Sequence, residues 1–184
     1  DGLWHGHVDE AVRRVREQLA EVEKALIPAG LHVVGDVMSA EERRETLLAM
    51  ARVSRPDLEL PSMVEAIGGS NPGGVLLERA ERGVAKVVDE LMRSHSTAWA
   101  RDALASDGWI RHTIAADGHP VLVARCIEEL GRIDSLLREN GEIEGLLRAL
   151  DGRFVPPAPG GDLLRMPTVL PTGRNLYAFD PYRV

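Results

Sequence analysis

The sequence predicts a mainly α-helical fold, namely a helical bundle with a short extended segment near residues 31–34 and a long, irregular Pro/Gly-rich C-terminal segment. Aromatic residues make up only 4% of the 184 residues, so Leu, Val, Ile and Ala must form the core, which favours helix-on-helix packing. Apolar residues recur at helical spacing along most of the chain. Six of the eleven prolines lie after residue 152, where that spacing stops. We therefore expect a helical domain at residues 1–152 and an extended segment at residues 153–184.

The first predicted helix covers residues 8–28 and ends at Pro28 and Gly30. Its apolar residues alternate steps of four and three and so form one stripe: Val8, Val12, Val15, Leu19, Val22 and Leu26. The stripe covers fewer than three heptads, which favours packing on the same domain over a coiled coil. The β-branched Val33 and Val34 then predict the short extended segment.

Two capping boxes predict the starts of the next helices. Ser39 is followed three residues later by Glu42, and Ser62 is followed by Glu65, so that each hydroxyl can accept a free backbone N–H while the glutamate reaches back. The first of these helices is expected to stop before Pro56, because a proline disfavours helix in the residue before it.

A long helical stretch is predicted from about residue 75 to residue 104. Gly83 weakens it by about 1 kcal/mol relative to alanine, so we expect a bend there or two helices. Residues 106–119 are predicted to be a loop, followed by a helix from Pro120 to about Arg138 and a short helix that ends at Gly152. The expected core residues of the long stretch are Val84, Val87, Val88, Leu91 and Met92.

Composition excludes several classes of function. A net charge of −7 argues against a nucleic-acid partner, because phosphate binding needs a basic face. No apolar run approaches the roughly 18–20 residues that cross a bilayer, and the N-terminus lacks the apolar core of a signal peptide. The single cysteine, Cys126, cannot form an internal disulfide, which predicts a cytoplasmic protein. Its mid-helix position predicts a small, buried apolar role.

The C-terminal stretch "LPTGRNLYAFDP" is rich in residues with special geometry. Gly173 suits a tight turn, Arg174 offers a planar set of donors suited to a carboxylate, and Asn175 can bind nearby backbone. Asp180 and Pro181 favour a second turn. Two interpretations stay open: the polar side chains satisfy the backbone of their own loop, which is favoured, or Arg174 or Asn175 faces a ligand cavity. Three residues could anchor the segment on an apolar surface: Leu176, Tyr177 and Phe179.

Several motifs in the same order resemble the family of the large porphyrin-binding H subunit of magnesium chelatase and the large subunit of aerobic cobaltochelatase. The C-terminal stretch resembles the family's LPTGRN…DP motif. The other segments that carry the resemblance are "LIPAGLHVVGD", "SAEERRETL", "LPSMVEAIG" and "LRALDGRFVPPAPGGDLLRMP". Together they cover most of residues 19–184, with the weakest correspondence between about residues 69 and 118. The large subunit of this family is far longer, so we expect an internal segment that is inactive alone.

The resemblance implies an ATP-driven insertion of Mg²⁺ into protoporphyrin IX in (bacterio)chlorophyll biosynthesis, with Mg²⁺ and the porphyrin as substrates. The implied partners are the rest of the H subunit and two smaller AAA+-type subunits, I and D, which hydrolyse the ATP. In agreement, this chain has no phosphate-binding loop motif, so we expect no nucleotide site here. The segment "PAPGGDLLR" resembles the magnesium branch. A cobaltochelatase segment that serves cobalamin biosynthesis, or a non-catalytic helical scaffold or docking module, remain the alternatives.

Within this resemblance no catalytic residue or resident metal site is assigned. The expected substrate-binding residues are Arg174, Asn175, Tyr177 and His32. The expected structural motif residues are Gly173, Asp180, Pro181, Gly160, Gly161 and Asp162. For His32, a hydrogen bond to a backbone carbonyl is favoured over a place beside the macrocycle. For the three tryptophans, packing within the protein is favoured over stacking on a porphyrin: Trp4, Trp99 and Trp109.

Overall fold

The computed structural model describes Val12 and residues 34–177, and for residues 175–177 it describes the backbone alone. The chain divides into two compact units after Val33, and residues 34–177 belong to the second. The predicted helix at residues 8–28, apart from Val12, and the extended segment, apart from Val34, lie outside the described residues. Three predicted site residues also lie outside them: His32, Asp180 and Pro181.

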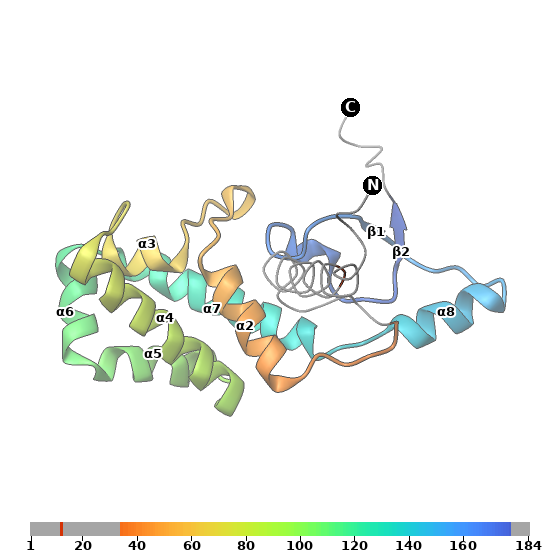
Figure 1. Cartoon of the computed structure of the whole chain (residues 1–184), viewed down its shortest axis with the longest axis horizontal. Coiled ribbons are helices and arrows are strands. Elements are labelled where there is room, and N and C mark those ends of the chain that lie inside the picture. Colours follow the sequence, from red (N-terminus) through yellow and green to blue (C-terminus); the bar gives the residue numbers. More distant parts are fainter. Residues whose placement is uncertain (1–11, 13–33, 178–184) are drawn as a thin grey trace, which may run out of the picture. The chain divides into compact units, whose positions relative to one another are not determined.

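Residues 34–177 form seven α-helices, two 3₁₀ turns and two very short strands (Figure 1), which confirms the mainly α prediction. The elements are α2 (Ala40–Ala51), η1 (Pro56–Leu58), α3 (Met63–Gly68), α4 (Gly74–Ser94), α5 (Thr97–Ser106), α6 (Gly108–Ala116), α7 (Pro120–Leu137), α8 (Glu142–Leu150), β1 (Pro157–Pro159), η2 (Pro167–Val169) and β2 (Asn175–Tyr177). Helices α2 to α7 pack together in one bundle, with α4 in contact with all the others.

Both predicted capping boxes are present. Ser39 Oγ accepts from the backbone N–H of Glu42 at 3.2 Å, and the Glu42 carboxylate accepts from the N–H of Ser39 at 2.8 Å. The same pair of bonds joins Ser62 and Glu65 at 3.2 and 3.0 Å. Because each box depends only on residues three apart, the sequence alone identifies where α2 and α3 begin.

The core is aliphatic, as the composition predicts. Side chains of α4 and α7 form its centre, together with residues of α2 and α3. Four of the five residues expected in the core of α4 are buried, namely Val84, Val87, Val88 and Leu91. The fifth, Met92, is only partly buried. The helical stretch divides into α4 and α5, but the break lies at His95, which has φ +54°, and not at Gly83. Gly83 instead gives Ile67 room to pack on α4, since a Cβ there would lie 3.0 Å from Ile67 Cδ1.

The prediction of a loop at residues 106–119 is wrong, because α6 occupies residues 108–116. Asp107 caps this helix by accepting from the N–H groups of Trp109 and Ile110 at 3.1 and 3.2 Å. The hydrogen bond from Lys86 Nζ, at 2.5 Å, lowers the pKa of Asp107 below its ordinary value. Gly, Trp, Ile and Thr have low helix propensity, but burial of Ile110 and Thr113 against the bundle offsets it.

The segment after α8 is irregular in its described part, apart from η2 and one pair of strands. β1 and β2 pair in parallel, with Pro157 opposite Asn175 and Pro159 opposite Tyr177. Between them, Leu170 is buried in the core cluster, and Leu163, Leu164 and Val169 pack partly against it. The segment is therefore held against the helical bundle by apolar contacts as well as by the polar ones that follow.

Candidate functional site

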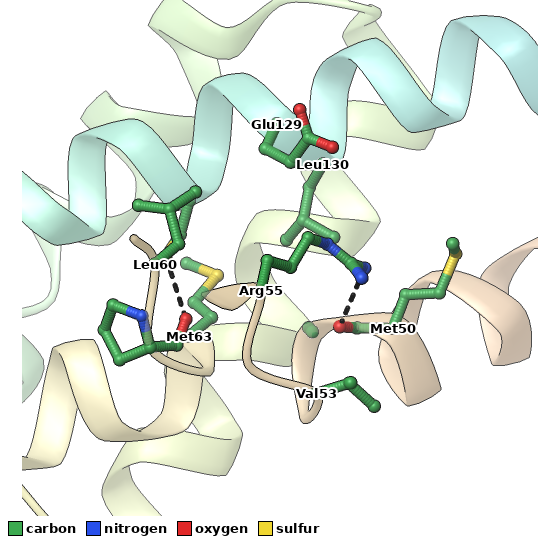
Figure 2. A pocket seen from close by; sticks show the side chains of 10 residues that line it. Met50, Val53, Arg55, Leu60, Met63, Glu129 and Leu130 are labelled. Atoms are coloured by element: carbon green, nitrogen blue, oxygen red, sulfur yellow. Dashed lines mark hydrogen bonds between the residues drawn. The ribbon is translucent and has the colours of Figure 1, made fainter. Parts of the chain in front are cut away.

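A small pocket lies where the end of α2 and the loop to α3 meet α7 (Figure 2). It is lined by Met50, Ala51, Val53, Arg55, Leu60, Pro61, Met63, Cys126, Glu129 and Leu130. Its cavity volume of about 20 Å³ is enough for one water molecule. The pocket is therefore far too small for a tetrapyrrole, and its importance lies in the charged residue that it contains.

Arg55 is the buried cation of this pocket, with only 4% of its surface exposed. Its Nη2 donates to the Met50 carbonyl at 3.3 Å, as Figure 2 shows, and its Nη1 donates to the Leu164 carbonyl at 3.2 Å. Its backbone also pairs with that of Leu60. Burial lowers the pKa of Arg55 from its ordinary value, and the negative charge of Glu129 opposes that effect. Arg55 thus connects α2, the following loop and the C-terminal segment.

Cys126 lies in the same pocket and confirms the prediction of a buried cysteine, since it is 6% exposed. Burial raises the pKa of its thiol to about 11. Thiolate is the reactive form, so at pH 8 iodoacetamide should alkylate Cys126 about a hundredfold more slowly than in the chain unfolded by urea. Mass spectrometry of timed samples measures this rate, which should rise about tenfold per pH unit up to about pH 11. Equal rates in the folded and the unfolded chain would show that the thiol is not buried.

The LPTGRN motif (residues 170–175) forms a turn that Arg174 holds from within. The Nη2 of Arg174 donates to the carbonyls of Thr168 and Leu170 at 2.6 and 2.7 Å, and its Nε donates to that of Pro171 at 3.2 Å. For Arg174 this geometry matches the interpretation in which a polar side chain satisfies the backbone of its own loop. A ligand contact of Arg174 stays a prediction. For Asn175 and Tyr177 the structure gives only the backbone, which lies in β2.

Gly173 brings the turn into direct backbone contact with the start of α8. It has φ +85°, and a Cβ at this position would lie 2.0 Å from the Gly141 carbonyl oxygen. From the other side, a Cβ on Gly145 would lie 2.1 Å from the carbonyl oxygen of Gly173. Three glycines therefore let two backbones approach more closely than any side chain would allow. The turn at Gly173 therefore contacts Gly141 and Gly145 at the start of α8, two partners that were not predicted from the sequence.

The other predicted site residues of the described part lie in local structure. Gly160 and Gly161 precede a turn in which Asp162 Oδ1 accepts from the N–H of Leu164 at 2.9 Å, and its carbonyl accepts from Met166 at 2.7 Å. The two described tryptophans are mostly exposed, and each lies near an arginine side chain. Arg93 lies 5.5 Å from the Trp99 ring and Arg79 lies 4.9 Å from the Trp109 ring.

The buried residue Asp134, on α7, was not predicted from the sequence, and only 1% of the whole residue is exposed. Its Oδ1 lies 3.2 Å from Arg43 Nε, and its Oδ2 lies 3.3 Å from Arg138 Nη2 and 3.6 Å from His95 Nδ1. The only signal in the sequence is an acidic residue four positions after Leu130, on the apolar face of a helix. Its partners on α2 and at the end of α4 are distant in sequence, so the cluster could not be predicted.

Among the described residues, no group of three or more His, Cys, Asp or Glu side chains is arranged to hold a metal ion. Within the same part of the chain, no helix combines the length and the apolar character needed to cross a bilayer.

Comparison with known proteins decides the family. The family model described as CobN/Magnesium Chelatase matches residues 4–184, which is almost the whole chain. The chain belongs to the CobN/magnesium chelatase family. The family resemblance predicted from the motifs is therefore confirmed.

Relatives from both branches of the family are similar to the chain. The magnesium-chelatase H subunit of Rhodobacter capsulatus is 40% identical over 130 residues, which are 66% of this chain and 11% of that protein. The chloroplastic magnesium-chelatase protein ChlH of Oryza sativa subsp. japonica is 31% identical over 212 residues, covering 96% of this chain and 15% of the relative. The aerobic cobaltochelatase protein CobN of Pseudomonas aeruginosa is 32% identical over 183 residues, covering 88% and 14%. The chain thus spans only a small part of the length of these relatives.

Proposed function

We propose that the chain is an internal segment of a magnesium-chelatase H subunit, which inserts Mg²⁺ into protoporphyrin IX in (bacterio)chlorophyll biosynthesis. In this proposal the rest of the subunit completes the site, and AAA+-type partner subunits hydrolyse the ATP. The observation that carries the proposal is the 40% identity to the Rhodobacter capsulatus protein over 66% of the chain, beside 32% over 88% of the chain to the Pseudomonas aeruginosa cobaltochelatase protein. The match to the latter covers 88% of the chain, so cobalt insertion is the second candidate.

The chemistry of insertion defines what such a segment contributes. Mg²⁺ must lose tightly held water, two pyrrole N–H protons must leave, and the macrocycle must be held while this happens. The bundle would serve as a scaffold that fixes the LPTGRN motif, through Arg55 on one side and the contact between Gly173 and α8 on the other. A fixed motif favours insertion because a substrate held in one orientation loses less entropy in the reaction.

Arg174 is the residue of this motif that we propose for substrate binding. Its loop uses the N–H groups of Nε and Nη2. A guanidinium has five N–H donors, so the two on Nη1 remain for a carboxylate such as a porphyrin propionate. His32, Asn175 and Tyr177 remain proposed substrate contacts as well, on the strength of their places in family motifs.

Protoporphyrin binding to the full-length parent subunit tests the proposal, with quenching of tryptophan fluorescence as the measurement. We expect saturable quenching, and a dissociation constant raised about tenfold by Arg174→Ala, which removes a charge-assisted hydrogen bond to the porphyrin together with the contacts that hold the turn. Arg165→Ala is the matched control, because this arginine of the same segment is 81% exposed and only loosely paired with Asp162. The absence of saturable quenching would contradict the proposed function. Equal affinities for the two variants would contradict only the role of Arg174.

A further inference from the structure

The side chain of Asn140, just before α8, joins that helix to a segment 104 positions earlier in the chain. Its Nδ2 donates to the Asp36 carbonyl at 2.7 Å, and its Oδ1 accepts from the N–H of Glu142, the first residue of α8, at 3.0 Å. A carboxamide supplies both the donor and the acceptor that these two contacts need, whereas a carboxylate supplies only the acceptor. Asn140 therefore fixes the first turn of α8 to the backbone of Asp36.

The same early segment meets α8 at a second point, Gly35. The N–H of Gly35 donates to the Glu142 carboxylate at 2.7 Å. Gly35 has φ +85°, and a Cβ at this position would lie 2.6 Å from Ile143 Cδ1. Residues 35–36 thus hold the first turn of α8 through two hydrogen bonds and one close approach that requires a glycine.

The LPTGRN turn contacts the same end of α8. A Cβ on Gly141 would lie 2.8 Å from the carbonyl oxygen of Thr172, and a Cβ on Gly145 would lie 2.1 Å from that of Gly173. No side chain separates the two backbones at these points, so a displacement of the start of α8 would displace the turn as well. The contacts that set the position of α8 therefore also set the position of the turn.

Helix α8 gains little of its position from packing. Helices α2 to α7 pack against one another, whereas none of them packs along α8 in the described part of the chain. Of the nine residues of α8, only Gly145 is buried. Because so little of its apolar surface is removed from water, α8 depends on the contacts at its start to fix where it lies.

We propose that Asn140 is a positioning residue for the LPTGRN turn and, through that turn, for Arg174. The loop holds Nε and Nη2 of Arg174, and Asn140 holds the loop by fixing α8 to residues 35–36. Nη1 is thereby oriented as the donor to a porphyrin carboxylate. This inference rests on the proposed function, because the orientation of Arg174 matters only if that residue contacts a porphyrin.

A double-mutant cycle on the full-length parent subunit tests the proposal, with protoporphyrin quenching of tryptophan fluorescence as the measurement. We expect Asn140→Ala to raise the dissociation constant about fivefold, since it removes two hydrogen bonds at the start of α8. In the Arg174→Ala background the same change should have no further effect, because the side chain that it orients is gone. The double variant should therefore bind about tenfold more weakly than the parent, whereas independent effects would multiply to about fiftyfold.

Asn140→Asp separates positioning from capping of the helix. An aspartate keeps the acceptor for the N–H of Glu142 but loses the donor to the Asp36 carbonyl. Hydrogen exchange of the α8 amides should therefore stay close to the parent, while porphyrin binding weakens as it does in Asn140→Ala. Parent affinity in the aspartate variant would mean that capping alone matters, which overturns the proposal. If Asn140→Ala failed to fold, the aspartate variant would carry the cycle.

Asn71→Gly is the control, because Asn71 is an exposed asparagine of another loop with φ +53°, and its affinity should equal that of the parent. An unchanged dissociation constant in Asn140→Ala, or the same rise with and without Arg174, would overturn the positioning role. The absence of saturable quenching in the parent would contradict the proposed function and the positioning role together. Saturable binding by the parent thus decides the proposed function, and the cycle decides the role of Asn140.

Discussion

Replacing Asp134 with Asn is expected to lower the free energy of unfolding by about 3–5 kcal/mol, because it removes one partner of a buried ion cluster. The Asp134 side chain is 2% exposed and that of Arg43, whose Nε lies 3.2 Å from its Oδ1, is 16% exposed. The N–H of Arg43 Nε has no partner in hydrogen-bond geometry, so this contact is an ion pair and depends on the charge of the carboxylate. Without that charge, Arg43 is left desolvated and uncompensated.

Urea unfolding followed by circular dichroism measures this loss. Asp89→Asn is the matched control, because the ion pair of Asp89 with Arg44, at 2.6 Å, joins side chains that are 55% and 41% exposed. A pair so exposed contributes at most about 1 kcal/mol. If the two substitutions lowered the stability equally, the Asp134 cluster would have no special role in joining α2, α4 and α7.

Gly173→Ala is expected to cost about 3 kcal/mol or more. The φ of +85° alone costs an alanine about 1–2 kcal/mol, and a Cβ 2.0 Å from the Gly141 carbonyl oxygen forces the two backbones apart. Gly152→Ala isolates the first effect, since Gly152 has φ +67° and its Cβ would meet nothing within 4 Å. Urea titrations should therefore show a loss at Gly173 about 2 kcal/mol larger than at Gly152. Equal losses would mean that the turn does not contact α8 closely.

The helix starts that the sequence predicts correctly depend only on residues close together in the chain. The capping boxes at Ser39 and Ser62 need only residues three positions apart, and Pro120 does begin a helix because its fixed φ suits the first turn. The loop predicted at residues 106–119 is wrong for the complementary reason. There the local propensity is poor, and α6 forms because Ile110 and Thr113 are buried by residues distant in sequence.

In the candidate site, too, local features could be predicted from the sequence and long-range contacts could not. Gly173 could be predicted to lie in a tight turn, because glycine tolerates a positive φ. The partners of that turn, Gly141 and Gly145, could not be predicted, since only the folded chain brings α8 beside it. For Arg55 the sequence likewise predicts only that a helix ends before Pro56. Its hydrogen bond to the Leu164 carbonyl joins residues 109 positions apart and could not be predicted. Long-range polar contacts of this kind leave no periodic pattern in a sequence.

Metal insertion by the full-length parent subunit is the most direct test of the central claim. The subunit would be combined with its AAA+-type partners, ATP, protoporphyrin IX and Mg²⁺, and the fluorescence of the magnesium porphyrin would be followed over time. We predict ATP-dependent formation of the magnesium porphyrin. Insertion of Co²⁺ into a tetrapyrrole precursor of cobalamin, without any magnesium product, would contradict the claim.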